Sequence, residues 1–316
     1  RVDPHGFAKQ SQKGWPAAAL AAMGRSMPNA QPRTTPTGIG EREFIALMAM
    51  LMSLQALSID AMLPALGQIA ADLHLSDPND RQLVIGLFLL GSGVGALMPG
   101  ALADRYGRRP VLLVSLACYI AMAIASALVR DFTALLVCRV IQAVSSAGLS
   151  VLPGAIIRDR FAGDRMARMM STITVVFMVV PMIAPSYGQA VMAVAGWRWI
   201  FGGMAVMAAA IALWVLLRLP ETLKPENRQT LHPAAIAGNM WLAASNRPAM
   251  GYMLGGALLT GGMFGYINSS QQLVAEHFGA GDSFPLIFAA MAGGMALANF
   301  SNSRIVERFG ARRVSH

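Results

Sequence analysis

Eight long apolar runs constrain what this chain can fold into. Each has about 18 residues or more with few charges, the length a helix needs to cross the hydrocarbon core of a bilayer. The runs are Phe44–Leu66, Leu83–Leu102, Val111–Val129, Phe132–Ile157, Met169–Ala195, Trp197–Leu217, Met250–Ser270 and Phe284–Ser301. They are continuous, whereas the strands of a membrane β-barrel would show alternating segments of about 10 residues. The pattern predicts an all-α membrane protein, a polytopic helical bundle.

The composition excludes a soluble globular protein. Of the 316 residues, 55% are hydrophobic and only 13% are charged, against about 25% charged in soluble domains. Cys118 and Cys138 both lie inside apolar runs, so no disulfide framework or zinc spacing is predicted. The histidines lie in tails and loops without metal-ligand spacing. We therefore expect no metal site and no cofactor.

The polar segments divide the chain into four parts. Residues 1–43 are rich in proline and basic residues and predict a disordered cytoplasmic tail. Residues 44–217 hold six apolar runs and predict a six-helix bundle. Residues 218–249 carry four prolines and predict a cytoplasmic linker, and residues 250–316 hold the last two runs, a partial second bundle. The short Arg130–Asp131 connection predicts a tight helical hairpin between the third and fourth runs.

The basic residues predict the orientation. Short cytoplasmic loops of membrane proteins carry an excess of lysine and arginine. If the runs alternate in direction, all but four of the 25 basic residues lie on the side of the N-terminus. Arg81, Arg130 and Arg198 lie on the other side, and Arg139 lies within a run. The N-terminus is thus predicted to be cytoplasmic, and the net charge of +9 indicates a lipid bilayer as partner and no nucleic acid.

The loop after the second run is a charged turn punctuated by glycines. It reads GALADRYGRRP over Gly100–Pro110. Gly100 would let the second helix approach a neighbour closely, Gly107 would permit a tight reversal, and Asp104 would bond locally or pair with an arginine. The candidate gating residues are Gly100, Asp104, Arg105, Gly107, Arg108 and Arg109. An ordinary cytoplasmic turn with basic residues is the alternative.

A weaker copy of this turn follows the eighth run. Its corresponding residues are Glu307, Arg308, Gly310 and Arg312. A repeat after the second and eighth helices is what two six-helix halves would give.

Five segments carry a resemblance to a known family. Gly100–Pro110 resembles the cytoplasmic signature of the major facilitator superfamily. Leu57–Leu66 resembles the first helix of its bicyclomycin and chloramphenicol resistance (Bcr/CflA) branch, which are drug:proton antiporters. Arg139–Gln142 resembles the fourth-helix motif of proton-coupled members, Pro181–Gly188 keeps the paired prolines of the fifth helix, and Pro220–Leu223 matches the PETL that follows the sixth. The resemblance implies twelve helices, drug export and the bacterial inner membrane.

Asp60 and Arg139 are the only strongly ionisable side chains deep within the runs. Such residues are costly in hydrocarbon and are functional candidates by default. The first and fourth helices run in opposite directions, and a rise of about 1.5 Å per residue gives the two side chains comparable depth. An aspartate that moves between an apolar environment and an arginine can take up and release a proton. Gln142 would lie on the same helix face as Arg139; a static ion pair between Asp60 and Arg139 is the alternative.

These features predict a proton-coupled exporter of small apolar or cationic drug-like molecules that works by alternating access. Asp60, Arg139 and Gln142 would couple substrate and proton. A transporter of another small metabolite, importing or exporting, and an inactive truncated membrane fragment remain alternatives. A membrane enzyme would need a catalytic cluster at the interface, which the sequence lacks, so we expect no enzyme. The absence of a P-loop disfavours ATP-driven pumping.

The resemblance also sets an expectation about completeness. Members of this superfamily have twelve helices, and this sequence has eight apolar runs and begins at Arg1. It therefore predicts a fragment or truncated product that supports little transport by itself. The seventh and eighth helices would then carry exposed small-residue faces, such as Gly261–Gly265.

Overall fold

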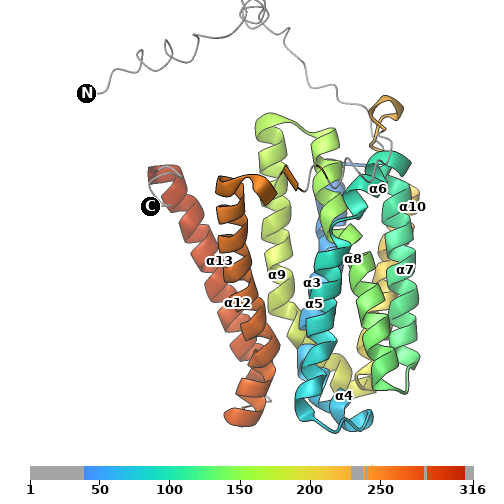
Figure 1. Ribbon diagram of the computed structural model, residues 1–316, viewed down its shortest axis with the longest axis vertical. Coiled ribbons are helices and arrows are strands. Elements are labelled where there is room, and N and C mark those ends of the chain that lie inside the picture. The colour runs from blue at the N-terminus through green and yellow to red at the C-terminus, as the bar shows by residue number, and fades with distance from the viewer. Residues whose placement is uncertain (1–38, 229–237, 239–240, 243, 281–282, 310–316) are drawn as a thin grey trace, which may run out of the picture. The chain divides into compact units, whose positions relative to one another are not determined.

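The computed structural model describes residues 39–228, 238, 241–242, 244–280 and 283–309 (Figure 1). All of them belong to one compact unit. Its elements are α3 (Glu41–Asp60), η1 (Leu63–Ala65), α4 (Leu66–Asp72), η2 (Pro78–Gln82), α5 (Leu83–Gly95), α6 (Pro99–Tyr106), α7 (Arg108–Leu128), α8 (Phe132–Arg160), α9 (Gly163–Ala195), α10 (Arg198–Arg218), η3 (Pro225–Asn227), α12 (Arg247–Gln271), η4 (Gln272–His277) and α13 (Phe284–Phe309). The η4 segment is a π-helical turn.

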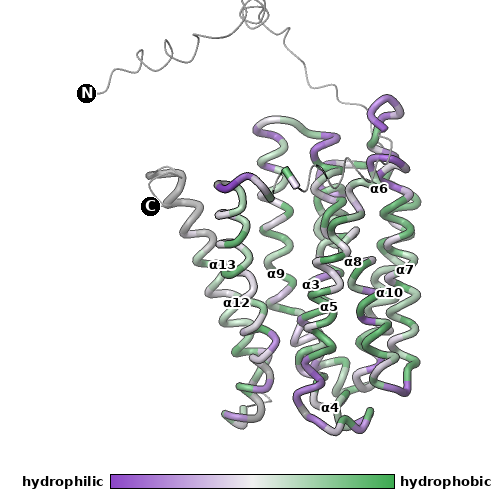
Figure 2. The backbone as a smooth tube through the Cα atoms, viewed as in Figure 1, coloured by the Kyte–Doolittle hydropathy of each residue, from purple (hydrophilic) through white to green (hydrophobic). Residues whose placement is uncertain are grey.

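The prediction of an all-α membrane fold is confirmed. Within the described ranges, five helices are long and apolar enough to cross a membrane, or six if the bent pair of α5 and α6 is one span. Figure 2 shows hydrophobic residues along the helix bodies and hydrophilic residues at the connecting turns. The seventh and eighth predicted runs form α12 and α13. Among their described residues, only Phe284–Met295 of α13 forms an apolar helix, and it is shorter than a membrane span.

The second predicted span is not one continuous helix. The sequence predicts a helix over Leu83–Leu102, whereas the structure ends α5 at Gly95, begins α6 at Pro99 and bends by 43° between them. Pro99 has no amide hydrogen, and its ring would clash with the carbonyl four residues earlier. The apolar run continues through this break, so hydropathy does not reveal it.

The first span breaks at Asp60. This residue ends α3, and the amide of Met62 then bonds to the carbonyl of Ile59 in a tighter turn that leads into η1. Pro64 cannot donate the amide hydrogen that would bond to the Asp60 carbonyl in a continuous helix. Gly188 of α9 lies against this break, because a Cβ there would collide with the carbonyl oxygen of Ala61.

Small residues bring α5 and α8 together. A Cβ added at Gly95 would lie 2.7 Å from the Cα of Val144, and one at Gly91 would lie 3.1 Å from the Cβ of Ala143. Close packing of this kind is a main source of helix association in membranes. The expectation that Gly100 supports such an approach is wrong, because a Cβ there would meet nothing within 4 Å. The contact lies on α5, before the helix bends, rather than on α6.

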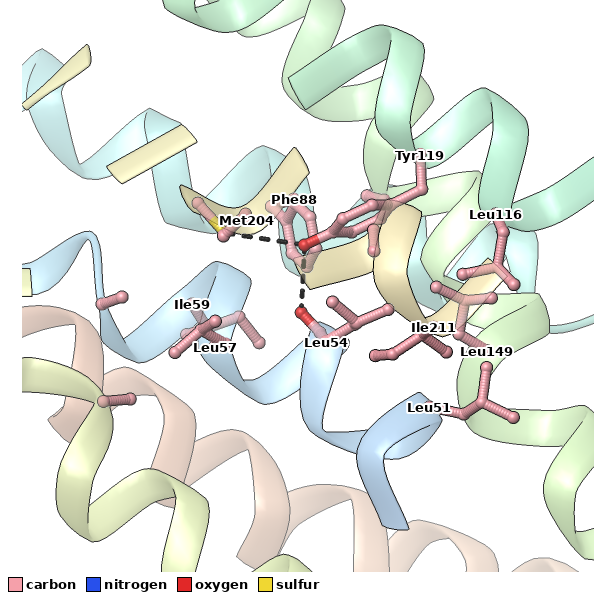
Figure 3. Packing of buried hydrophobic residues seen from close by; sticks show 14 of the residues in the cluster. Leu51, Leu54, Leu57, Ile59, Phe88, Leu116, Tyr119, Leu149, Met204 and Ile211 are labelled. Atoms are coloured by element: carbon pink, nitrogen blue, oxygen red, sulfur yellow. Dashed lines mark hydrogen bonds between the residues drawn. The ribbon is translucent and has the colours of Figure 1, made fainter. Parts of the chain in front are cut away.

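The glycines of α12 are uncovered. A Cβ at Gly251, Gly255, Gly261 or Gly265 would meet no described atom within 4 Å. The packed core instead lies among α3, α5, α7, α8 and α10. Figure 3 shows part of it, including Leu51, Leu116, Leu149 and Ile211, whose side chains are fully or almost fully buried.

Candidate functional site

Arg139 lies on α8 with its side chain fully buried. Its guanidinium group donates three hydrogen bonds, each to a neutral acceptor. Nη1 donates to Oε1 of Gln142 at 2.8 Å, Nη2 donates to the carbonyl of Ser58 at 2.7 Å, and Nε donates to the carbonyl of Val84 at 3.3 Å. The arginine therefore joins α8 to both α3 and α5.

Two aromatic rings face the same guanidinium. Its carbon lies 4.1 Å from the ring centroid of Phe88 and 5.7 Å from that of Phe201. The face of an aromatic ring attracts a cation, most strongly where water is excluded. In the part of the chain that the structure describes, no carboxylate forms an ion pair with Arg139. Its charge is balanced by carbonyl dipoles, one amide and these rings.

Asp60 ends α3 and is not bonded to Arg139. Its side chain is 5% exposed and makes no hydrogen bond or ion pair with any described residue. Arg139 instead contacts the backbone of Ser58, two residues earlier on α3. The static Asp60–Arg139 ion pair weighed from the sequence is therefore absent from this state. Gln142 is fully buried as well, and among the described residues its Nε2 has no hydrogen-bond partner.

Ser58 and Tyr119 complete this buried network, and sequence reasoning missed both. The Ser58 hydroxyl donates to the Leu54 carbonyl at 2.8 Å and lies next to the Tyr119 hydroxyl. The Tyr119 hydroxyl also lies 3.2 Å from the Leu54 carbonyl and 3.5 Å from the sulfur of Met204 (Figure 3). Neutral side chains in an apolar run carry no charge to single them out, so only their depth near Asp60 could have indicated a role.

The turn between α6 and α7 forms a charged cluster centred on Arg108. Its Nη1 lies 2.7 Å from Asp104, and its Nε donates to Asp159 of α8 at 2.9 Å. Asp104 thus pairs with an arginine, as the sequence allowed, and the cluster joins α6, α7 and α8. Arg105 stacks on the ring of Tyr106, and Arg109 donates to the carbonyl of Leu216 on α10.

Glu221 of the PETL segment binds the start of α7. Its carboxylate accepts hydrogen bonds from the backbone amides of Arg108 at 3.0 Å and Arg109 at 3.1 Å. The first amides of a helix lack partners within the helix, and the positive end of the helix dipole favours a carboxylate there. Gly107, with a φ of 105°, makes the reversal between α6 and α7, and a Cβ there would collide with Glu221. The sequence indicated the tight turn but not its partner.

A polar contact links the η2 and η4 segments, which we call the η2–η4 contact. The Nε2 of Gln82 donates to Oε1 of Gln272 at 2.6 Å, and the Nε2 of Gln272 lies 3.5 Å from Oδ1 of Asn79. It joins the first six helices to α12. An open pocket of about 450 Å³ lies beside it, lined by Ser269, Gln272, Leu273 and His277.

The second copy of this turn, predicted after the eighth run, falls mostly beyond the described residues. Glu307 and Arg308 lie in α13, but only their backbone is described. Gly310 and Arg312 lie outside the described residues.

Comparison with known proteins places this arrangement in a family. Residues 46–315 match the sequence profile of the Major Facilitator Superfamily. The chain is 33% identical over 277 residues to the bicyclomycin resistance protein homolog of Haemophilus influenzae, with 86% of this chain and 68% of that protein covered. It is 28% identical over 275 residues to the multidrug resistance protein MdtL of Klebsiella pneumoniae, with 86% of this chain and 68% of that protein covered.

A solved structure shares the fold. The human organic anion transporter MFSD10 (TETRAN) superposes with a TM-score of 0.59 at 22% identity, covering 81% of this chain and 72% of that one. The sequence profile and the solved structure indicate the same helical membrane fold. This chain belongs to the Major Facilitator Superfamily, a family of transporters and not of enzymes.

Proposed function

We propose that the chain acts in proton-coupled export of small apolar or cationic drug-like molecules. It would do so by alternating access in the bacterial inner membrane, with its N-terminus in the cytoplasm. Relatives named for bicyclomycin resistance and multidrug resistance support the substrate class. The concentration of basic residues on one side of the predicted spans supports the orientation.

One observation carries the proposal: a buried aspartate that bonds to no described residue follows, by two positions on α3, the Ser58 carbonyl that binds a buried arginine. A charged carboxylate at 5% exposure is costly without a counter-ion, so the arrangement suits a protonated Asp60. When the proton leaves, the charged carboxylate attracts Arg139. The arginine already binds α3 through the Ser58 carbonyl, two residues before Asp60. Drug binding that favours the arrangement with a charged Asp60 paired to Arg139 would expel the proton.

The charged cluster at the cytoplasmic turn has a separate role in this proposal. Asp104, Arg108 and Asp159 hold α6, α7 and α8 together at one end of the helices. All three lie at helix ends next to the α6–α7 turn, whereas Asp60 lies at the end of α3. They would therefore stabilise one conformation of the transport cycle rather than contact substrate. The unpartnered Nε2 of Gln142 offers a hydrogen-bond donor in the coupling network when Arg139 moves.

The test is proton release on drug binding. By thermodynamic linkage, if a proton weakens drug binding, the drug must expel the proton to the same extent. Chloramphenicol or ethidium added to purified, weakly buffered protein should release protons that a pH indicator records. Asp60→Asn should still insert into membranes and bind a neutral drug, but without release. Equal proton release from the wild type and Asp60→Asn would overturn the assignment of Asp60, and no release from either would overturn proton coupling.

A further inference from the structure

A groove lies between the end of α9 and the start of α10, and we call it the α9–α10 groove. Its volume is about 420 Å³, within the range of sites that bind small molecules. Such sites are mostly apolar and hold only a few polar groups, which also describes this one. The walls include Tyr187, Val191, Val194 and Ala195 of α9 and Trp199 and Gly203 of α10.

The groove opens away from the packed core. Val194 is 89% exposed and Trp199 is 64% exposed, so in a bilayer these apolar side chains would face lipid. Tryptophan favours the boundary between hydrocarbon and headgroups. With a rise of about 1.5 Å per residue, Tyr187 lies about 12 Å deeper along α9 than Ala195 at its end. A molecule dissolved in the membrane can therefore reach the groove from the side.

Tyr187 places one polar group at the inner end of the groove. Its hydroxyl lies against α10 at Gly203, where a Cβ would collide with it. It forms no hydrogen bond with any residue that the structure describes. A hydroxyl without a partner is unfavourable in apolar surroundings. A lipid acyl chain has no acceptor at this depth, so the hydroxyl favours a ligand that brings an acceptor of its own.

The inner end of the groove adjoins the buried network of the candidate site. Gly203 precedes Met204, whose sulfur lies 3.5 Å from the Tyr119 hydroxyl and 3.6 Å from the Ser58 hydroxyl (Figure 3). The carbonyl of Ser58 in turn accepts from Arg139. Neighbouring residues of α10 thus contact the groove on one side and this network on the other.

We propose that the α9–α10 groove binds apolar drug-like molecules that carry a hydrogen-bond acceptor and enter from the membrane. The Tyr187 hydroxyl would donate to that acceptor, and the aliphatic side chains and Trp199 would contact the apolar body. The choice of drug-like molecules rests on the proposed function, whereas the groove and its hydroxyl without a partner are observed independently of it. An acyl chain would fill the same walls and leave the hydroxyl unpaired.

The experiment uses benzophenone as the probe. It is an apolar aromatic ketone with one acceptor, and under illumination its carbonyl carbon bonds to nearby C–H groups. The purified chain in phospholipid nanodiscs is illuminated at increasing probe concentrations, and mass spectrometry locates the adducts. We expect adducts on the groove residues, such as Val191 and Val194, and we expect chloramphenicol to compete with them.

Tyr187→Phe keeps the ring and removes only the hydroxyl. It should raise the half-saturating concentration of benzophenone about three- to ten-fold, the worth of one hydrogen bond to a neutral acceptor. Tyr252→Phe is the matched control, because it makes the same change on α12, where the side chain is 84% exposed, and it should have no effect. Diphenylmethane, which has a methylene in place of the carbonyl, should compete equally well in the wild type and in Tyr187→Phe.

The outcomes separate this inference from the proposed function. Equal half-saturating concentrations in the wild type and Tyr187→Phe, adducts only outside the groove, or no competition by chloramphenicol would overturn the inference. Photolabelling requires no proton transfer. Chloramphenicol that competes in the groove without releasing protons would therefore overturn proton coupling and leave the groove site standing, and proton release without labelling of the groove would do the reverse.

Discussion

Glu221, at the start of the linker after α10, accepts a hydrogen bond from the backbone amide of Arg108 in the first turn of α7, at 3.0 Å. Its carboxylate also accepts the amides of Thr222 and Leu223, both at 2.9 Å, so it organises its own turn. The threonine hydroxyl lies 3.4 Å from Asp159, the acid that also binds Arg108. The beginning of the linker is therefore fixed to the turn between α6 and α7 through both backbone and side chains.

Replacing Glu221 should loosen this segment. Loss of a helix N-cap costs about 1 kcal/mol of stability, and Glu221→Ala also removes the acceptor that organises its own turn. Trypsin should cut the variant faster after Arg228, just beyond the anchored residues, and the thermal midpoint in detergent should fall. Glu226→Ala is the matched control, because Glu226 is exposed in the same linker. Equal cleavage of both variants and the wild type would show that Glu221 does not anchor the linker.

Gly107→Ala should be more damaging than an alanine at a comparable glycine. Gly107 has φ 105° and ψ 154°, a region that is essentially limited to glycine. Gly196 has φ 84° and ψ 170°, and a Cβ there would meet nothing within 4 Å. Both substitutions should cost about 1–3 kcal/mol in backbone strain, but only the one at Gly107 adds a clash with Glu221.

A double variant can separate the backbone strain at position 107 from the clash with Glu221. Adding Glu221→Ala to Gly107→Ala removes the clash, so the two losses of stability should sum to more than the measured loss of the pair. Neighbouring residues that share a contact show coupling of about 0.5–3 kcal/mol. Thermal unfolding in detergent provides the measurement. Strict additivity would mean that the alanine at position 107 does not meet the carboxylate.

Hydropathy predicted the helical framework because spanning segments must be long and apolar. It could not predict where the helices break. The runs continue through Asp60–Pro64 and through Gly95–Pro99 without any polar residue after the aspartate. Proline within an apolar run is compatible with a kinked span as well as a broken one, so tertiary contacts such as that of Gly188 on Ala61 decide the outcome.

Sequence reasoning identified only part of the candidate site, because the contacts within the site depend on how the helices pack. Asp60 and Arg139 stand out because charge is rare within a span, but their distance and pairing depend on how α3 and α8 pack. Phe88, Ser58 and Tyr119 look like ordinary core residues in the sequence. Glu221 was visible only as part of a motif, since the backbone amides that donate to it lie more than a hundred residues away in the chain.

The η2–η4 contact should be open to covalent capture. After replacement of the native Cys118 and Cys138 by serine, the pair Gln82→Cys and Gln272→Cys should cross-link rapidly with a short bifunctional thiol reagent, because their side chains meet at 2.6 Å. The pair Gln82→Cys and Asp131→Cys, on different turns, serves as control. Alternating access requires the two halves to separate on one side, so drug or a change of pH should alter the rate. A rate as slow as the control would mean that these segments do not meet in the membrane.

Gly188→Ala should separate α9 from the break in the first span. Alanine normally stabilises a helix interior relative to glycine, by about 0.5–1 kcal/mol. At Gly188, however, the new Cβ would collide with the Ala61 carbonyl oxygen and lie 3.1 Å from the ring of Pro64. A backbone carbonyl cannot rotate away as a side chain can, so overpacking should cost about 1–3 kcal/mol. Gly154→Ala on α8 is the control, since its Cβ would meet only the flexible end of Met170, at 4.0 Å. The thermal midpoint in detergent should fall for the first variant and hold or rise for the second. A rise in both would show that α9 does not press on the turn that follows Asp60.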